Sequence, residues 1–139
     1  MSAERDALAT LAREACARAH APYSGIHVGA AIRSAAGATY TGTNVENAAY
    51  PLGNCAEASA IAAGVQAEGP QFRIAETAVW AFDRDGRAVA VSPCGGCRQR
   101  IREFASAATR IHACDASGVR RSFTCDELLP VSFGPEHLS

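Results

Sequence analysis

Two cysteines separated by two residues, in the stretch Pro93-Cys94-Gly95-Gly96-Cys97-Arg98, constrain this chain more than any other feature. Such a pair can chelate one metal ion or form a reversible disulfide. Ser92 can cap a helix start, and Pro93 suits the first helical position because no intrahelical N–H bond is lost there. Both sulfurs would then lie in the first helical turn, where the positive end of the helix dipole stabilises thiolates. The pattern alone leaves both chemistries open.

The length and charge of the chain limit what kind of protein this is. We expect a single domain over residues 1–139, because this length supports one hydrophobic core and not two. A formal net charge of −1 gives no general attraction to nucleic acids or membranes. The start Met1-Ser2-Ala3-Glu4-Arg5-Asp6 is not typical of a signal peptide, and no apolar run approaches the ~20 residues of a membrane span. We therefore expect a cytoplasmic protein without nucleic-acid or membrane partners, whose cysteines stay reduced.

The hydrophobic pattern predicts helices and strands in the order of an α/β layer fold. Apolar residues at helical spacing predict an amphipathic helix over residues 3–20, with Cys16 on its apolar stripe. Further helices are expected over residues 55–68 and 92–105, with a helical turn at 126–130. Strands are predicted at residues 27–33, 39–43, 74–82, 109–114 and 119–124. This order implies a mixed sheet with helices packed on it.

Cys55 is the best candidate for a third metal ligand. It follows Asn54, which can cap the predicted helix over residues 55–68, so its sulfur would also lie at a helix N-terminus. Three thiolates suit zinc and leave its fourth position for water, as catalytic zinc sites do. Their charge with Zn²⁺ sums to −1, which two helix dipoles would partly offset.

Glu57 follows Cys55 by two positions and projects from the same helical turn. A carboxylate beside an activated water can take its proton and deliver it to a substrate nitrogen. The alternative is a capping box, in which Glu57 bonds back to the N–H of Asn54. The downstream Pro-Cys-x-x-Cys motif favours the catalytic role.

Cys55-Ala56-Glu57 followed by Pro93-Cys94-Gly95-Gly96-Cys97 resembles the zinc deaminase signature in its three-cysteine form. Nearly the whole chain is similar, in the same order, to the small homotetrameric cytidine deaminases, including residues 21–24, 28–31, 44–50, 92–99 and 128–135. The resemblance implies a three-layer α-β-α fold with a mixed five-stranded sheet. It also implies hydrolysis of cytidine and deoxycytidine to uridine and deoxyuridine plus ammonia, in pyrimidine salvage.

The resemblance further implies a metal centre and a proton carrier. Cys55, Cys94 and Cys97 would hold one Zn²⁺ per subunit, with a bound water or hydroxide as fourth ligand. That hydroxide would attack C4 of the pyrimidine, and Glu57 would protonate N3 and then the leaving ammonia.

Substrate contacts are implied for a second group of residues. Asn44 and Glu46 would hold the ribose 3′-hydroxyl, and the backbone around Ala56 and Ser92 would read the pyrimidine edge. Three residues would cover the base or complete a site shared between the subunits of a homotetramer: Ile26, Tyr50 and Phe133. For Phe133 the alternative is simple core packing.

Two positions depart from the family pattern. Ala58 stands where relatives often carry an arginine that donates to ligand sulfurs, and its loss should make the metal a weaker Lewis acid. Arg98, next to a ligand, is a candidate replacement. Ile26 stands where relatives commonly have Phe, so it would cover a base without stacking. His27 is predicted to be a loop or strand-end histidine and not a ligand.

Three other functions fit parts of the sequence. A thioredoxin-like reductase explains the pair Cys94 and Cys97 but leaves Cys55-Ala56-Glu57 without a role. A structural zinc module would recruit a fourth cysteine, from Cys16, Cys114 or Cys125. A deaminase of a blasticidin-type aminopyrimidine antibiotic is the alternative within the superfamily. A polynucleotide deaminase is disfavoured, because the composition indicates no basic groove.

Overall fold

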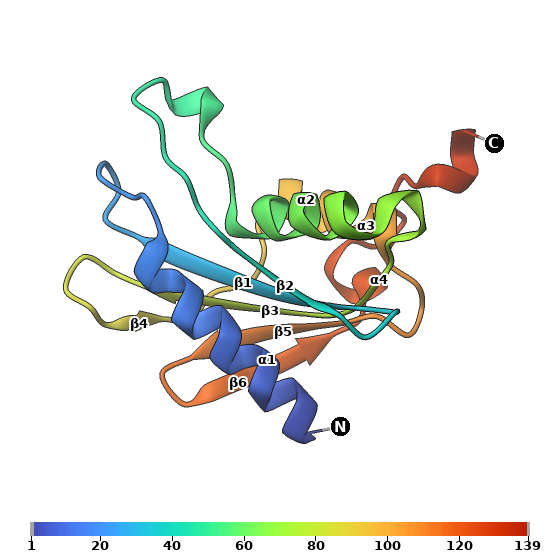
Figure 1. The fold of residues 1–139 in the computed structure, drawn as a ribbon, viewed down its shortest axis with the longest axis horizontal. Coiled ribbons are helices and arrows are strands. Elements are labelled where there is room, and N and C mark those ends of the chain that lie inside the picture. The colour runs from blue at the N-terminus through green and yellow to red at the C-terminus, as the bar shows by residue number, and fades with distance from the viewer. Residues whose placement is uncertain (1, 139) are drawn as a thin grey trace.

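The computed structural model describes residues 2–138 as three layers with a mixed sheet in the middle (Figure 1). The main strands are β1 (His27–Ser34), β2 (Thr39–Thr43), β3 (Ile74–Phe82), β5 (Arg110–Asp115) and β6 (Gly118–Phe123). Their spatial order is β2-β1-β3-β5-β6, with β3 and β5 parallel and the other neighbours antiparallel. The short strand β4 (Ala88–Val89) pairs with β3 outside this order. The predicted α/β fold and mixed sheet are confirmed, with β4 as an additional strand.

Helices cover both faces of this sheet (Figure 1). One face carries α1 (Ser2–Ala15), and the other carries α2 (Ala56–Glu68), α3 (Gly95–Phe104) and α4 (Cys125–Leu128). The first helix is shorter than predicted, because the chain tightens into a 3₁₀ turn at Cys16–Arg18. Within residues 2–138, none of the helices has the length and apolar character needed to cross a membrane.

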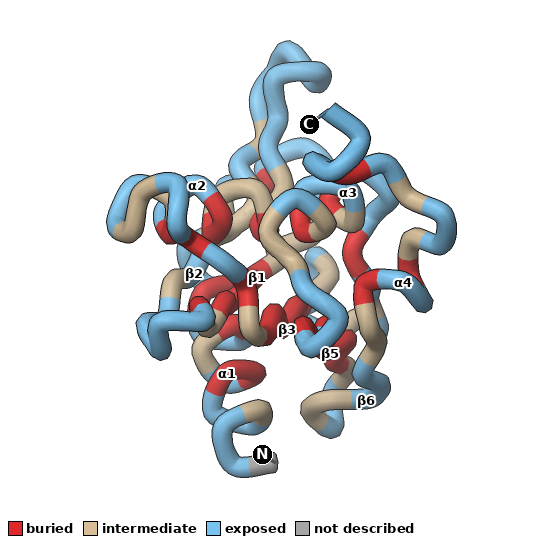
Figure 2. The backbone as a smooth tube through the Cα atoms, turned by 90° about the vertical axis from the view of Figure 1, so that its right-hand side faces the viewer, coloured by how far each residue is buried: buried red, intermediate tan, exposed pale blue. Residues whose placement is uncertain are grey.

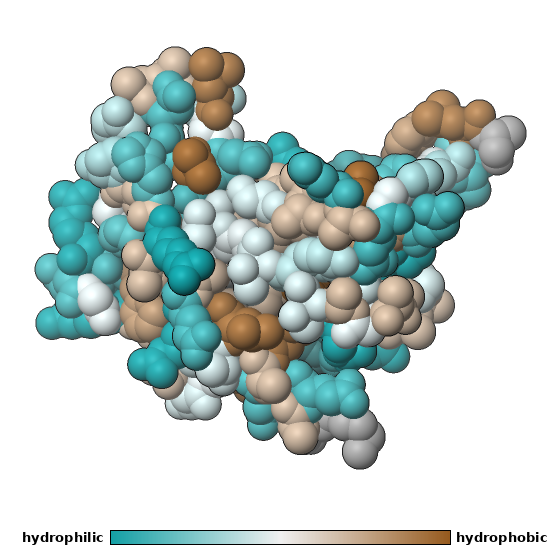
Figure 3. All heavy atoms as spheres, viewed as in Figure 1, coloured by the Kyte–Doolittle hydropathy of each residue, from teal (hydrophilic) through white to brown (hydrophobic). Residues whose placement is uncertain are grey.

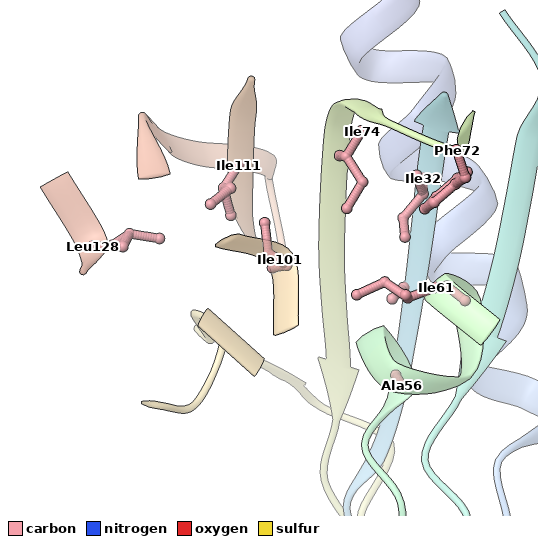
Figure 4. Packing of buried hydrophobic residues seen from close by; sticks show 10 residues of the cluster. Ile32, Ala56, Ile61, Phe72, Ile74, Ile101, Ile111 and Leu128 are labelled. Atoms are coloured by element: carbon pink, nitrogen blue, oxygen red, sulfur yellow. The ribbon is translucent and has the colours of Figure 1, made fainter. Parts of the chain in front are cut away.

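Alternation along the strands divides the core into two clusters. In β1, Ala31 packs under α1, whereas Ala30 and Ile32 face α2 and α3. Figure 2 shows the buried residues concentrated in the central strands and on the inward sides of the helices. Figure 4 shows the cluster on the side of α2 and α3. Its side chains come from the sheet, α2, α3, α4 and the segment before β3: Ile32, Ala56, Ile61, Phe72, Ile74, Ile101, Ile111 and Leu128. This shared core holds α2 and α3 on the same sheet face.

Helix α2 approaches β2 closely because Gly42 has no side chain. A Cβ on Gly42 would lie 2.4 Å from the amide nitrogen of Ala60 and 2.5 Å from the carbonyl oxygen of Ala56. Both are backbone atoms, which cannot move aside by a rotamer change. Glycine at this position therefore sets the depth of α2 and with it the position of the functional residues in its first turn.

A buried polar network lies in the sheet away from the cysteine motif. The Nε2 of His112 is 3.0 Å from a Glu76 carboxylate oxygen, and its Nδ1 is 2.7 Å from the Ser122 hydroxyl. Neutral histidine satisfies both contacts, with Nε2–H donating to Glu76 and Nδ1 accepting from Ser122. Arg33 pairs with the same carboxylate. Burial first, and then the nearby cations Arg5 and Arg33, together lower the pKa of His112 to about 4.

This network predicts acid destabilisation. The folded pKa of His112 lies below its ordinary value of 6.5, so the unfolded chain binds the proton first as the pH falls. The contribution of neutral His112 to the free energy of unfolding is fully present above pH 6.5. It is lost as the pH falls toward 4, by up to about 3 kcal/mol. We expect urea denaturation to show a smaller loss for His112→Gln than for the wild type over this range. Parallel pH profiles for the two proteins would contradict the assignment.

Candidate active site

Three cysteine sulfurs meet where α2 and α3 begin. The sulfurs of Cys55, Cys94 and Cys97 all lie within 4.8 Å of one another, and those of Cys55 and Cys94 are 4.0 Å apart. Cys55 is the N-cap residue of α2 and Cys94 is the N-cap residue of α3. Cys97 lies in the first turn of α3 and is fully buried. The structure thus brings together all three predicted ligands.

The helix caps predicted at Asn54 and Ser92 are wrong. Each helix begins after its cysteine, so Asn54 and Ser92 lie one and two residues before the N-cap positions. Both N-cap cysteines have an extended backbone and make no side-chain cap bond. Their sulfurs belong to the three-cysteine group, so tertiary contact outweighs the capping preference of Asn and Ser.

Glu57 lies in the first turn of α2 with only 4% of its surface exposed. The capping-box alternative is wrong, because the N-cap residue is Cys55 and α2 has no side-chain cap. Burial raises the pKa of the Glu57 carboxyl, although its own backbone amide, Cys97 and Arg100 act in the opposite direction. A carboxyl in this setting can hold or release a proton nearer neutral pH than an exposed one.

The thiols differ in acidity. Burial raises the pKa of Cys55 and of Cys97, whereas the backbone N–H of Cys97 lowers the pKa of Cys94. Buried thiols of high pKa lose their protons to a bound divalent cation. Three sulfurs at these separations fit zinc, which prefers sulfur and nitrogen ligands and tetrahedral coordination.

Within residues 2–138, no other acidic, histidine or cysteine side chain belongs to this group. Cys16 and Cys114 are buried in the cluster under α1, and Cys125 is buried on α4. A four-cysteine structural site is therefore not supported by the described part of the chain. His27 is the first residue of β1, as predicted, and lies outside the group.

A cavity of about 330 Å³ opens beside Cys55 and Cys94. Its polar wall includes Asn44, Glu46, Glu57 and Ser92, and valines supply apolar wall that was not predicted: Val28, Val45, Val79 and Val91. A second cavity of about 320 Å³ shares Glu46 and Gly53 with the first. These volumes suit a small molecule.

Asn44 and Glu46 are held by the loop before β1 and by the start of β1 itself. The Asn44 amide accepts from the Val28 N–H and donates to the Ile26 carbonyl, both at 2.8 Å. One N–H and one lone pair of this amide stay available for a ligand. Glu46 accepts from the N–H groups of Tyr23 and Ser24, at 2.9 and 3.1 Å, and from the Ser24 hydroxyl. These bonds, the hydroxyl first, lower the pKa of Glu46.

The three residues predicted to cover the base or to complete a shared site do not line the 330 Å³ cavity of this single chain. Tyr50 lines the second cavity, is 73% exposed and has its ring 5.6 Å from that of Tyr23. Phe133 is 56% exposed and stacks on His137, so core packing within the chain is wrong. Ile26 is half-buried at the entrance to β1.

The arginine that contacts a ligand sulfur is Arg100, and not Arg98, which directly follows Cys97 in the sequence. Arg98 donates to the carbonyls of Pro93 and Leu128, at 2.8 and 2.9 Å, and ties the cysteine motif to α4. Arg100 instead donates from Nη1 to the Cys97 sulfur, at 3.6 Å. The sequence feature that could have predicted this contact is the position of Arg100 three residues after Cys97, which places both residues on one helix face.

Comparison with known proteins gives a consistent result. Residues 2–113 match the family model described as the cytidine and deoxycytidylate deaminase zinc-binding region. The chain is 36% identical to a cytidine deaminase of Sporosarcina psychrophila, over 91% of this chain and 89% of that protein. It is 35% identical to the cytidine deaminase of Halalkalibacterium halodurans, over 98% of each.

Solved structures agree with these matches. The fold is similar to the crystal structure of cytidine deaminase from Burkholderia pseudomallei, with a TM-score of 0.80 and 35% identity, over 91% of this chain and 97% of that one. It is also similar to cytidine deaminase from Mycobacterium tuberculosis, with a TM-score of 0.74 and 34% identity, over 92% and 95% of the two chains.

Proposed function

The chain belongs to the cytidine and deoxycytidylate deaminase family, and from this premise we propose how its residues act on cytidine and deoxycytidine. It is a zinc-dependent hydrolase that releases ammonia from C4 of the pyrimidine and leaves uridine or deoxyuridine, as in pyrimidine salvage. The observation that carries the proposed site is the buried Glu57 in the same cavity as the cysteine cluster. We propose that residues 1–139 form one catalytic domain located in the cytoplasm, where its cysteines would stay reduced.

Cys55, Cys94 and Cys97 hold the zinc ion in this proposal. When bound, zinc acts as a Lewis acid that makes water a nucleophile near neutral pH. Glu57 accepts a proton from the water and passes it to N3 of the ring. Once the oxygen has added to C4, Glu57 takes the second proton from that oxygen and gives it to the departing amino group, so that the C4 carbonyl forms as ammonia leaves. Its burial and raised pKa support this role, because one group must both accept and donate a proton.

The rest of the cavity binds the nucleoside. Asn44 and Glu46 hold the ribose 3′-hydroxyl, one as donor and the other as acceptor, which is supported by their place on the same cavity wall. The backbone around Ala56 and Ser92 contacts the pyrimidine edge. Valine side chains enclose the pyrimidine ring. Position 26, where relatives commonly have Phe, is Ile in this chain, so packing and not aromatic stacking orients the base.

A deamination panel tests this function. Zinc-loaded protein should release ammonia from cytidine and deoxycytidine, with kcat/KM for free cytosine lower by about 10²-fold or more, because the ribose contacts are lost. CMP, 5-methylcytidine and blasticidin S complete the panel. Ammonia from blasticidin S alone would favour the antibiotic deaminase, and disulfide reduction without zinc would favour the reductase.

We propose further that the enzyme is a homotetramer with shared sites. An arm carrying the 3₁₀ turn Tyr50–Leu52 rises from the layers, and hydrophobic surface gathers at its tip (Figures 1 and 3). Tyr50 and Leu52 are 73% and 72% exposed, and Phe133 is 56% exposed on another segment. A neighbouring chain that covers these residues would bring Phe133 to a base.

Subunit mixing tests the shared site. Glu57→Ala and Phe133→Ala proteins should each be impaired, and dissociation followed by reassociation of the mixture should restore part of the activity. Restoration is expected because some hybrid sites combine an intact Glu57 with an intact Phe133. Light scattering should give the mass of four chains for the wild type. A monomeric wild type with full activity would contradict the proposal.

A further inference from the structure

We propose that Arg100 is a positioning residue of the metal centre, which offsets the excess negative charge of three thiolates around zinc by donating to the Cys97 sulfur. This inference rests on the proposed function, because it takes zinc bound by the three cysteines as given. Arg100 acts through a ligand and has no assigned contact with substrate.

The contact joins an exposed cation to a buried ligand. Arg100 follows Cys97 by three residues on α3, and its Nη1 lies 3.6 Å from the Cys97 sulfur. Cys97 is fully buried, whereas Arg100 is exposed. The guanidinium therefore keeps most of its hydration and still delivers one N–H to the sulfur, which avoids the large cost of burying a cation.

Gly96 leaves room for this arrangement. A Cβ on Gly96 would lie 3.3 Å from Arg100 Nη1 and 3.9 Å from the Cys94 sulfur. The guanidinium thus lies beside the turn that carries a second ligand. A Cβ on the neighbouring Gly95 would meet nothing within 4 Å. The two glycines therefore differ in what a side chain would disturb.

The metal centre carries a net negative charge, which a cation close to one of its ligands stabilises. Three thiolates and Zn²⁺ sum to −1, and an ionised Glu57 nearby makes the total more negative. The N-termini of α2 and α3 offset part of this charge. Ala58 carries no charge, and the bonds of Arg98 go to Pro93, Leu128 and the Ser92 hydroxyl. Of the two arginines closest in sequence to Cys97, Arg100 is the one that donates to its sulfur.

Metal binding and spectroscopy test this role apart from turnover. Arg100→Met keeps the length of the side chain but removes charge and donor, and should weaken zinc binding about 10- to 100-fold in competition with a chromophoric chelator. The sulfur-to-cobalt charge-transfer band of the Co²⁺-substituted variant should move to lower energy, because a thiolate without its donor gives up electrons more readily. Arg100→Lys should bind zinc more tightly than Arg100→Met.

The two glycines supply a matched pair of variants. Gly96→Ala should weaken zinc binding and move the cobalt band in the same direction as Arg100→Met but by less, because its methyl group would lie 3.3 Å from Arg100 Nη1 and push the guanidinium outward by a few tenths of an ångström. Gly95→Ala should leave both unchanged. Neither glycine has a positive φ, so alanine fits the backbone at both and raises helix propensity equally.

The outcomes separate this inference from the proposed function. The role of Arg100 is overturned if Arg100→Met and Gly96→Ala bind zinc within about twofold of the wild type and have unchanged cobalt bands. A twofold change is well short of the loss of affinity expected when a hydrogen bond to a metal ligand is removed. A wild type that still binds one zinc and deaminates cytidine would leave the proposed function intact. A wild type that binds no stoichiometric zinc overturns the proposed function and this inference together.

Discussion

Glu57→Gln should lower kcat for cytidine by about 10²- to 10⁴-fold while the protein keeps its zinc. The substitution preserves the size and burial of a side chain that is 4% exposed, but an amide cannot exchange protons with water or with N3. The metal should stay because the three sulfurs form the ligand group and Glu57 is not part of it. Turnover by ammonia release and zinc content by atomic absorption measure the two effects separately.

Glu46→Gln is the matched control for this prediction. Glu46 lines the same cavity but accepts hydrogen bonds from the Tyr23–Ser24 loop and has its pKa lowered by them. Its replacement should raise KM more than it lowers kcat, because it removes a binding contact and no proton transfer. A Glu57→Gln enzyme that retained most of its kcat would refute the proposed proton carrier.

Cys97→Ala should abolish both zinc binding and turnover. It removes one of three protein ligands, and two thiolates cannot form the three-ligand site that a catalytic zinc needs. Because bound metal stabilises the folded state, the melting temperature of the wild type should rise with added zinc and that of the variant should not. Chelation of the wild type should likewise remove activity, and added zinc should restore it.

Cys114→Ala separates ligand loss from core damage. Cys114 is fully buried, as Cys97 is, but lies in the cluster under α1 and outside the sulfur group. Its replacement should cost stability of about 1 kcal/mol and leave the zinc content at one per chain. If Cys97→Ala kept stoichiometric zinc, the assignment of the three ligands would be wrong.

The local pattern determined much of this protein. Strands and helices follow from periods of 2 and 3.6 residues, so their ranges were predicted to within a few positions. The pair Cys94 and Cys97, and the pair Cys55 and Glu57, have short spacings that place each pair in one helical turn. The chemistry of these residue types, with the resemblance they carry, was enough to predict zinc and a proton carrier.

Only the tertiary structure decided how these pieces meet. Cys55 and Cys94 are 39 positions apart, and their sulfurs come to 4.0 Å because one core holds α2 and α3 on the same sheet face. Cys55 and Cys94, and not Asn54 and Ser92, are the N-cap residues of the two helices, because contact among the three sulfurs outweighs a local capping bond. Adjacency favoured Arg98, yet the helix turns about 100° per residue and carries Arg98 toward α4. Arg100, almost one full turn after Cys97, lies on the face where its charge reaches the sulfur.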